Sequence, residues 1–395
     1  MYKHLFRLIW NKRKQNFLFL SEILVSFLVI FALSSFLVFY FMNFRKPLGF
    51  KYQHVWAVSY SEPLKTKNLD SIRTFYDLLN ATLMSMPEIE AHSLSSGNFP
   101  YANSVSTSGF TVKGKNYSYI HNYTVEDSYL QTLDLKLLEG RWYRPEDAIS
   151  KNRNVVINES LRKQIFGSAP ALNQVMGDSK KENEKMKIIG VVKDVKANGD
   201  YWPSGSAIYY RMDSSSYTWV GTMLIKIRPG TGAAFENKLH KVLAQHMKNS
   251  NIEIKHMDEM RSSKNADTIV PMTIFVIIAA FLIINVALGL FGVLWYNINR
   301  RKGEIGLRRA MGATANSITR QLVAESSIMA TISVLTGTFF AIQFPLLHVF
   351  DINPMVYVFA LLITIAFIYL LVVLCSIYPG RQAASIHPAV ALHED

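Results

Sequence analysis

Long apolar runs alternate with sequence of soluble type along this chain. Four runs are long enough to cross a bilayer, which takes about 20 residues in a helix. These predicted spans are residues 17–42, 269–297, 322–344 and 355–378. Residues 43–266 have mixed charge, turn residues and short strand patterns. The pattern therefore predicts a membrane α-helical protein with four transmembrane helices and a large α+β extracytoplasmic domain inserted between helices 1 and 2.

The first 16 residues predict a cytoplasmic amphipathic segment. Leu5, Leu8 and Ile9 can share one helix face while Lys3 and Arg7 lie on another, which suits a helix at the inner membrane surface. A cleaved signal peptide is the competing interpretation of this basic start. We exclude it because the apolar run that follows is too long and no small-x-small cleavage site comes after it.

Short strand and helix patterns organise residues 43–266. Three segments predict a strand, a helix and a strand, and three later segments repeat that order. The first set is Gln53–Tyr60, Asn68–Met84 and Ile89–Leu94, and the second is Val220–Ile227, Gly232–Met247 and Ile252–Lys255. Each set predicts a β-α-β unit.

The residues between these two sets predict mostly β structure. Ser, Gly and Asn predict a loop over 95–109, and Phe110–Val112 and Tyr117–Tyr123 bracket a four-residue hairpin turn at 113–116. Further along, the phrase from Leu137 to Trp142 predicts a turn. Val155–Glu159 predicts a strand running into a capped helix that ends at Gly167, and Ile188–Val195 predicts another buried strand.

Basic residues orient the chain. The net charge is +13, and Lys and Arg gather in 1–16, in the loop 298–320 and in the tail 379–395, while the turn 345–354 has neither. Short loops rich in Lys and Arg stay in the cytoplasm. We therefore expect both termini inside, residues 43–266 outside, and no nucleic acid as a partner.

The sequence carries little catalytic chemistry. Cys375 is the single cysteine, so an intramolecular disulfide is impossible, and the G-x-x-x-x-G-K-[ST] phosphate-binding motif is absent. No residue spacing suggests a metal site or a nucleophilic triad. We expect no enzyme activity and no cofactor in this chain, and ATP, if it drives the protein, would be bound by a partner subunit.

Three polar residues in the apolar runs are candidates for function. Glu22 and Glu325 lie near the inner ends of their spans, and Asn285 lies inside the second span. Glu22 can reach the headgroups, with a transport role as the alternative. Asn285 is expected to hydrogen-bond a neighbouring helix, and Gly289-x-x-Gly292 offers a flat patch for close packing.

The basic segment 300–314 predicts a short helix between two spans. Glu304 and Arg308 are four residues apart and can pair across one turn. Gly312 suits the left-handed residue that ends a helix, and Thr314 can cap the next one. A loop that only orients the spans is the simpler interpretation of the same residues.

The order of residues in this segment resembles the E-I-G-x-x-R-A-x-G-A signature of FtsX/MacB-type ABC transporter permeases. The resemblance implies a coupling helix within the loop 298–320 that docks on a separate ATPase subunit. The implied ATPase-coupling residues are Arg301, Glu304, Ile305, Gly306, Arg308, Arg309, Ala310, Met311 and Gly312.

Residues 43–266 also resemble this family, through the phrases G-R-W, P-E-D, V-V-I-N-E and I-G-V-V-K-D-V. The resemblance implies a MacB-like periplasmic core domain. Its porter-like part would combine 50–94 with 219–257, and 95–218 would form an inserted subdomain. The tail resembles the closing phrase of the family, except that Val390 replaces an acidic residue and His393 an arginine.

The resemblance implies a permease subunit that couples ATP hydrolysis by a separate ATPase to movements of its periplasmic domain. Export or extraction of a substrate from the outer leaflet or periplasm would follow. It also implies a second permease copy or a sister permease, a periplasmic adaptor or regulated protein, and the bacterial inner membrane as the location. The alternative is an FtsX-like signalling or scaffold protein that regulates a periplasmic partner.

Overall fold

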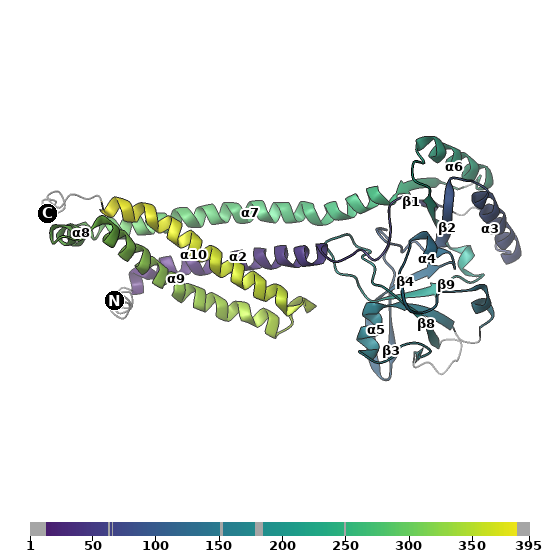
Figure 1. Ribbon diagram of the computed structural model, residues 1–395, viewed down its shortest axis with the longest axis horizontal. Helices are drawn as coiled ribbons and strands as arrows, with labels where there is room; N and C mark the ends of the chain where they lie inside the picture. The colour runs from purple at the N-terminus through teal and green to yellow at the C-terminus, as the bar shows by residue number, and fades with distance from the viewer. Residues whose placement is uncertain are drawn as a thin grey trace. The chain divides into compact units, whose positions relative to one another are not determined.

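The computed structural model describes residues 13–61, 64, 66–150, 153–177, 185–248 and 250–384. Its contacts divide the chain into two compact units. Residues 1–42 and 269–395 form what we call the helical unit, and residues 43–268 form the sheet unit. Figure 1 labels helices and strands of both. The amphipathic helix expected over 1–16 and the tail beyond residue 384 lie largely outside the described residues.

Four helices among the described residues are long and apolar enough to cross a membrane. They are α2 (Arg13–Phe44), α7 (Met257–Asn299), α9 (Ala315–Leu346) and α10 (Pro354–Ala384). A short helix, α8 (Lys302–Ala310), lies between α7 and α9, and a 3₁₀ turn, η4 (Val349–Asp351), lies between α9 and α10. Each long helix contains the apolar run from which a span was predicted and extends beyond it.

The extensions have local causes. Helix α9 begins before residue 322 because Thr314 caps it by accepting a hydrogen bond from the Ser317 amide at 3.3 Å. Helix α10 does not end at residue 378 but continues through Pro379, where a proline normally interrupts the backbone hydrogen bonds. The Thr319 hydroxyl of α9 donates to the Gly380 carbonyl at 3.1 Å, which holds this last turn against its neighbour.

The helical unit has an apolar core built around α2. Phe19, Ile23 and Phe27 are fully buried in it, packed with side chains of α7, α9 and α10. A Cβ on Gly337 of α9 would collide with the Phe27 ring, so the absent side chain sets how closely these two helices approach. The Ser333 hydroxyl of α9 also donates to the Leu20 carbonyl of α2 at 2.9 Å.

One half of the sheet unit is a four-stranded antiparallel sheet in the order β11-β1-β10-β2. The strands are β1 (Val55–Tyr60), β2 (Ile89–Ser95), β10 (Thr222–Ile227) and β11 (Ile252–His256), and the helices are α3 (Leu69–Met84) and α6 (Ala233–His246). These elements confirm the predicted strand-helix-strand order of both sets. In the sheet, β10 lies between the two strands of the first set, and β1 lies between the two strands of the second set. The two β-α-β sets therefore interlock. Segments 50–94 and 219–257 thus lie in one half.

Alternation along the strands places two apolar layers on opposite faces of this half. Trp56 and Val58 of β1 pack with Leu79 of α3 and Leu239 of α6. Ala57, between them in the sequence, packs on the other face with residues of the inserted segment.

The inserted segment extends the same sheet as β4-β9-β6-β8-β5, with β3 on β4 and β7 on β8. Its strands are β3 (Thr107–Val112), β4 (Lys115–Val125), β5 (Leu137–Gly140), β6 (Arg153–Asn158), β7 (Val175–Met176), β8 (Met186–Val192) and β9 (Ala207–Arg211). Short helical elements join them: α4 (Tyr129–Thr132), η1 (Pro145–Ile149), α5 (Glu159–Phe166) and η3 (Ser216–Thr218). The pair Ser95–Val125 joins the two halves.

Two local predictions were wrong in this segment. The hairpin turn has two residues instead of four, because Lys113 and Gly114 both have positive φ, the geometry of a tight primed turn. The phrase from Leu137 to Trp142 begins with strand β5, which pairs with β8, and is not a turn. The capped helix after β6 is confirmed, since the Asn158 side chain accepts from the Leu161 amide and Gly167 ends α5 with φ +61°.

Candidate functional site

The segment 300–314 forms the predicted helix between two apolar helices. Helix α8 ends as expected, with Gly312 at φ +96° and Thr314 capping α9. The Ala313 amide donates to the Arg308 carbonyl at 3.0 Å, which satisfies a carbonyl of the last turn. These features confirm the local geometry predicted from Gly312 and Thr314.

A closed ring of side-chain hydrogen bonds fixes α8 to the start of α9. Glu304 accepts from Arg308 at 2.5 Å, which confirms the predicted pair, and from Arg301 at 3.1 Å. Arg301 also donates to Glu325 at 2.8 Å. Gln321 completes the ring, donating to Glu325 at 3.0 Å and accepting from Arg308 at 2.7 Å. Two cations and two carboxylates thus balance, and each of the five side chains in the ring contacts two other members.

An apolar contact holds the opposite side of α8. Ile305 is 6% exposed and packs with Ile298 of α7 and Ile318 of α9. Gly306 beside it is buried. These two residues of the predicted coupling set therefore position the helix within this chain and are not available to a partner.

Leu307 and Met311 leave an apolar patch on the surface of α8. They are 51% and 72% exposed and lie four residues apart, so they share a face. Ala310 and Gly312 are exposed as well, whereas Arg309 is half-buried and donates to the Ala313 carbonyl at 3.3 Å. Sequence reasoning missed Leu307, although its spacing from Met311 was a usable signal.

The remaining polar candidates are separate from one another. Glu325, assigned to the membrane by sequence, belongs to the α8 ring. Glu22 lies against Gly289 of α7, where a Cβ would collide with its carboxylate. Asn285 is exposed, and its amide donates to the Phe281 carbonyl of its own helix at 2.8 Å. The expectation that a neighbouring helix hydrogen-bonds Asn285 stays a prediction, and within its own helix the amide already has the i−4 carbonyl as a partner.

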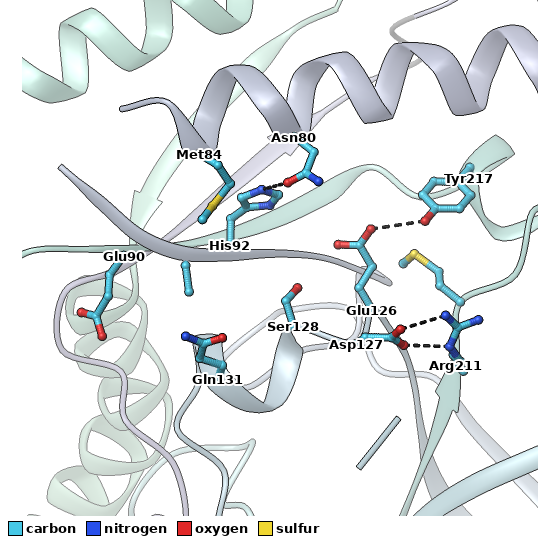
Figure 2. Close-up of a pocket in the computed structure, with 12 residues that line it drawn as sticks. Asn80, Met84, Glu90, His92, Glu126, Asp127, Ser128, Gln131, Arg211 and Tyr217 are labelled. Atoms are coloured by element: carbon cyan, nitrogen blue, oxygen red, sulfur yellow. Dashed lines mark hydrogen bonds and ion pairs between the residues drawn. The ribbon is translucent and has the colours of Figure 1, made fainter. Parts of the chain in front are cut away.

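A cavity of about 440 Å³ is a second candidate, in the sheet unit. Its lining comes from β2, α3, the start of α4 with the residues before it, and the segment from the end of β9 to η3. Figure 2 shows His92 hydrogen-bonded to Asn80, Glu126 to Tyr217, and Asp127 to Arg211. Burial lowers the pKa of His92 to about 4, so the imidazole is neutral at pH 7.

Most charges of this cavity are matched by a partner. Arg211 binds Asp127 through two hydrogen bonds of 2.7 and 2.8 Å, and Lys226 pairs with Glu90 at 2.9 Å. Glu126 accepts from the Leu94 amide at 2.6 Å, and burial raises the pKa of this carboxyl. The cavity is thus a polar, largely neutralised space. In the described part of the chain, no group of three or more His, Cys, Asp or Glu side chains suits a metal ion.

Comparison with known proteins gives two family matches that together span most of the chain. Residues 29–242 match the model of the MacB-like periplasmic core domain, and residues 276–388 match the FtsX-like permease C-terminal model.

Individual proteins are similar to parts of this chain. The macrolide export ATP-binding/permease protein MacB 1/2 of Paracoccus denitrificans is 27% identical over 231 residues, 56% of this chain and 34% of that protein. The uncharacterized ABC transporter permease YknZ of Bacillus subtilis is 23% identical over 217 residues, 54% of each chain. The crystal structure of the periplasmic region of MacB from Actinobacillus actinomycetemcomitans matches with a TM-score of 0.38 and 18% identity, covering 54% of this chain and 92% of that one. The alignments thus span about a third to a half of the relatives' length.

Proposed function

The chain belongs to the MacB/FtsX family of ABC transporter permeases, and on that premise we propose that it couples ATP hydrolysis by a separate ATPase subunit to movements of its periplasmic domain. Helix α8 is the docking element in this proposal. These 395 residues contain no G-x-x-x-x-G-K-[ST] phosphate-binding motif, so the proposal places ATP hydrolysis outside them.

The exposed patch of Leu307 and Met311 is the observation that carries this proposal. The ring of hydrogen bonds and buried Ile305 order a nine-residue helix that would be marginal on its own. Two large apolar side chains remain uncovered on that ordered helix. A rigid helix that presents apolar anchors suits insertion into a groove on a partner.

We propose that the four apolar helices cross the bacterial inner membrane, with α8 in the cytoplasm and the sheet unit in the periplasm. The basic residues of α8 and its flanks support this orientation. We further propose that the chain works with a second copy or a sister permease. Family membership supports such a pair, and an adaptor or regulated periplasmic protein would bind the sheet unit.

Co-purification of the ATPase tests the docking proposal. The full chain is extracted from its native membrane in mild detergent, and the proteins recovered with it are identified by mass spectrometry. Leu307→Asp places a charge in the contact, and we expect at least roughly tenfold less ATPase recovered. Glu304→Lys breaks the ring and should reduce recovery by misplacing the same patch.

Arg320→Ala is the matched control, since Arg320 is an exposed residue of the following helix. It should leave ATPase recovery unchanged. Equal recovery with Leu307→Asp and Arg320→Ala would refute docking through α8. Recovery of a cell-wall or signalling protein in place of an ATPase would support the scaffold alternative.

A further inference from the structure

The chain passes between the helical unit and the sheet unit at only two points. The first is Met42–Asn43, near the end of α2, and the second is Thr268–Ile269, within α7. Any displacement carried along the backbone from one unit to the other passes through these two points. The contacts that fix each crossing point to the sheet unit therefore decide which displacements reach the sheet unit.

A buried lysine fixes the first crossing point. Lys196 is 2% exposed, and its ammonium donates to the carbonyls of Asn43, Lys46 and Asp200, the last two at 2.8 and 2.9 Å. All three of its protons are used. Asn43 lies in the last turn of α2, where carbonyls have no partner within the helix and the helix dipole favours a cation.

A buried aspartate only four residues along fixes the second crossing point. Asp200 is bound by Arg261 of α7 through two hydrogen bonds and by the Asn265 amide at 3.1 Å. The Asp200 backbone amide in turn donates to the Asn265 side chain at 2.9 Å. The Trp202 indole donates to the Thr268 hydroxyl at 2.9 Å, directly at the crossing.

The backbone from Lys196 to Asp200 brings the contact with α2 close to the contact with α7. Gly199 has φ +95°, and a Cβ there would lie 2.9 Å from the Asn265 side-chain oxygen. The Lys196 ammonium bonds the Asp200 carbonyl, which links the two contacts. The Tyr201 ring stacks on Phe44 of α2 with centroids 5.3 Å apart. A loop that only connected β8 to β9 would not need to bury both an ammonium and a carboxylate.

We propose that residues 196–202, which we name the clasp, fasten both crossing points to the sheet unit so that α2 and α7 move it as one body. Lys196 and Asp200 are its positioning residues. This inference deepens the proposed function, since it assigns the place where the sheet unit receives movement. It also makes a claim that stands without an ATPase: the two helix ends are stabilised cooperatively.

Hydrogen–deuterium exchange on the full-length chain in detergent tests that cooperation. Lys196→Met removes the bonds to Asn43 and Lys46 at the end of α2 and the link to the Asp200 carbonyl, but no bond to α7 itself. The clasp nevertheless predicts about tenfold faster amide exchange in residues 262–268 of α7. Asp200→Ala removes contacts to α7 and should have the same effect on residues 41–46. Lys136→Met and Asp267→Asn, at exposed positions, are the matched controls.

A loss confined to the helix that each variant touches would overturn the clasp. Protection of β8 serves as the measure of an intact fold. If Lys196→Met or Asp200→Ala unfolds the sheet, Trp202→Phe replaces it, because this variant keeps an aromatic ring but lacks the indole N–H donated to Thr268. Faster exchange in residues 41–46 is then the expected result, and unchanged exchange there refutes the proposal.

Spin-label distances distinguish a failure of the clasp proposal from a failure of the proposed function. Labels at Tyr119→Cys and Leu347→Cys, both exposed positions, are placed in a Cys375→Ala background and measured with the ATPase, ATP and vanadate. We expect a nucleotide-dependent shift that Lys196→Met abolishes while ATPase recovery stays normal. A shift that survives in Lys196→Met overturns the clasp alone. Absence of any shift in the parent chain counts against the proposed function, and the exchange experiment still decides the clasp.

Discussion

At the scale of residues, several charged side chains have their hydrogen-bonding capacity filled by neighbouring groups of the chain. Asp147 is the clearest case. Arg141 donates to it twice, at 2.6 and 2.7 Å, and the Arg144 amide and Asn154 side chain add bonds of 2.9 and 2.6 Å. The P-E-D phrase is therefore a structural anchor that ties the segment after β5 to β6. Nothing in this arrangement requires a ligand.

The partners of Asp147 predict a specific dependence on pH. The Arg141 guanidinium, above all, lowers the pKa of this carboxyl to about 2, from an ordinary value near 3.8. A lowered carboxyl pKa contributes stability above pH 3.8, which is lost as the pH falls toward 2. Asp147→Asn should cost about 2 kcal/mol at pH 7 and flatten the change between pH 4 and 2. Thermal unfolding of the full chain, followed by tryptophan fluorescence, measures this loss.

Glu146→Gln is the control for that experiment, since Glu146 is the exposed neighbour in the same phrase. It should unfold like the parent chain at pH 7. The explanation fails if Asp147→Asn is no less stable than this control.

At the scale of elements, sequence patterns predicted most helices and strands but not their long-range partners. Alternation and helical spacing are local, so β1, α3 and α6 could be recognised from their own residues. The parallel pairing of β4 with β9 joins distant residues, from His121 with Ala207 to Val125 with Arg211, and no local pattern encodes it. Strand β5 was taken for a turn because its four residues are too few to show a period.

The candidate site at α8 shows the same difference between local contacts, which the sequence predicts, and contacts with another element, which it does not. The Glu304–Arg308 pair and the Gly312 terminus follow from spacing within one helix, and both were predicted. The contribution of Gln321 and Glu325 was not, since they reach α8 from the next helix. The exposed patch needed the structure as well, because burial of Ile305 decides which face of α8 remains free.

Close packing of α2 and α9 gives a test at this scale. Gly337→Leu would place a side chain where Phe27 lies, and we expect a loss of about 1–3 kcal/mol in stability. Thr336→Leu is the matched control, because Thr336 is exposed one residue earlier in the same helix. Thermal unfolding in detergent compares the two. Equal midpoints for both variants would contradict this close packing of α2 against α9.

At the scale of the whole molecule, the four long helices differ in how far their own chain covers them. Within the most apolar stretch of α7, 11% of residues are buried, against 33% for α2 and α9 and 22% for α10. Exposed apolar residues suit lipid, but Asn285 is polar and exposed on the same helix. A polar side chain in a bilayer is stabilised by a partner helix. We therefore expect α7 to face the second permease copy.

Cysteine cross-linking tests this pairing in the full-length protein. Around a two-fold axis, a residue at the centre of the interface lies near its own counterpart. In a Cys375→Ala background, Asn285→Cys should give a cross-linked dimer with a short bismaleimide in native membranes. Leu335→Cys, on α9 and 66% exposed, should stay monomeric. A dimer from Leu335→Cys and none from Asn285→Cys would place the interface on α9, leaving α7 to lipid.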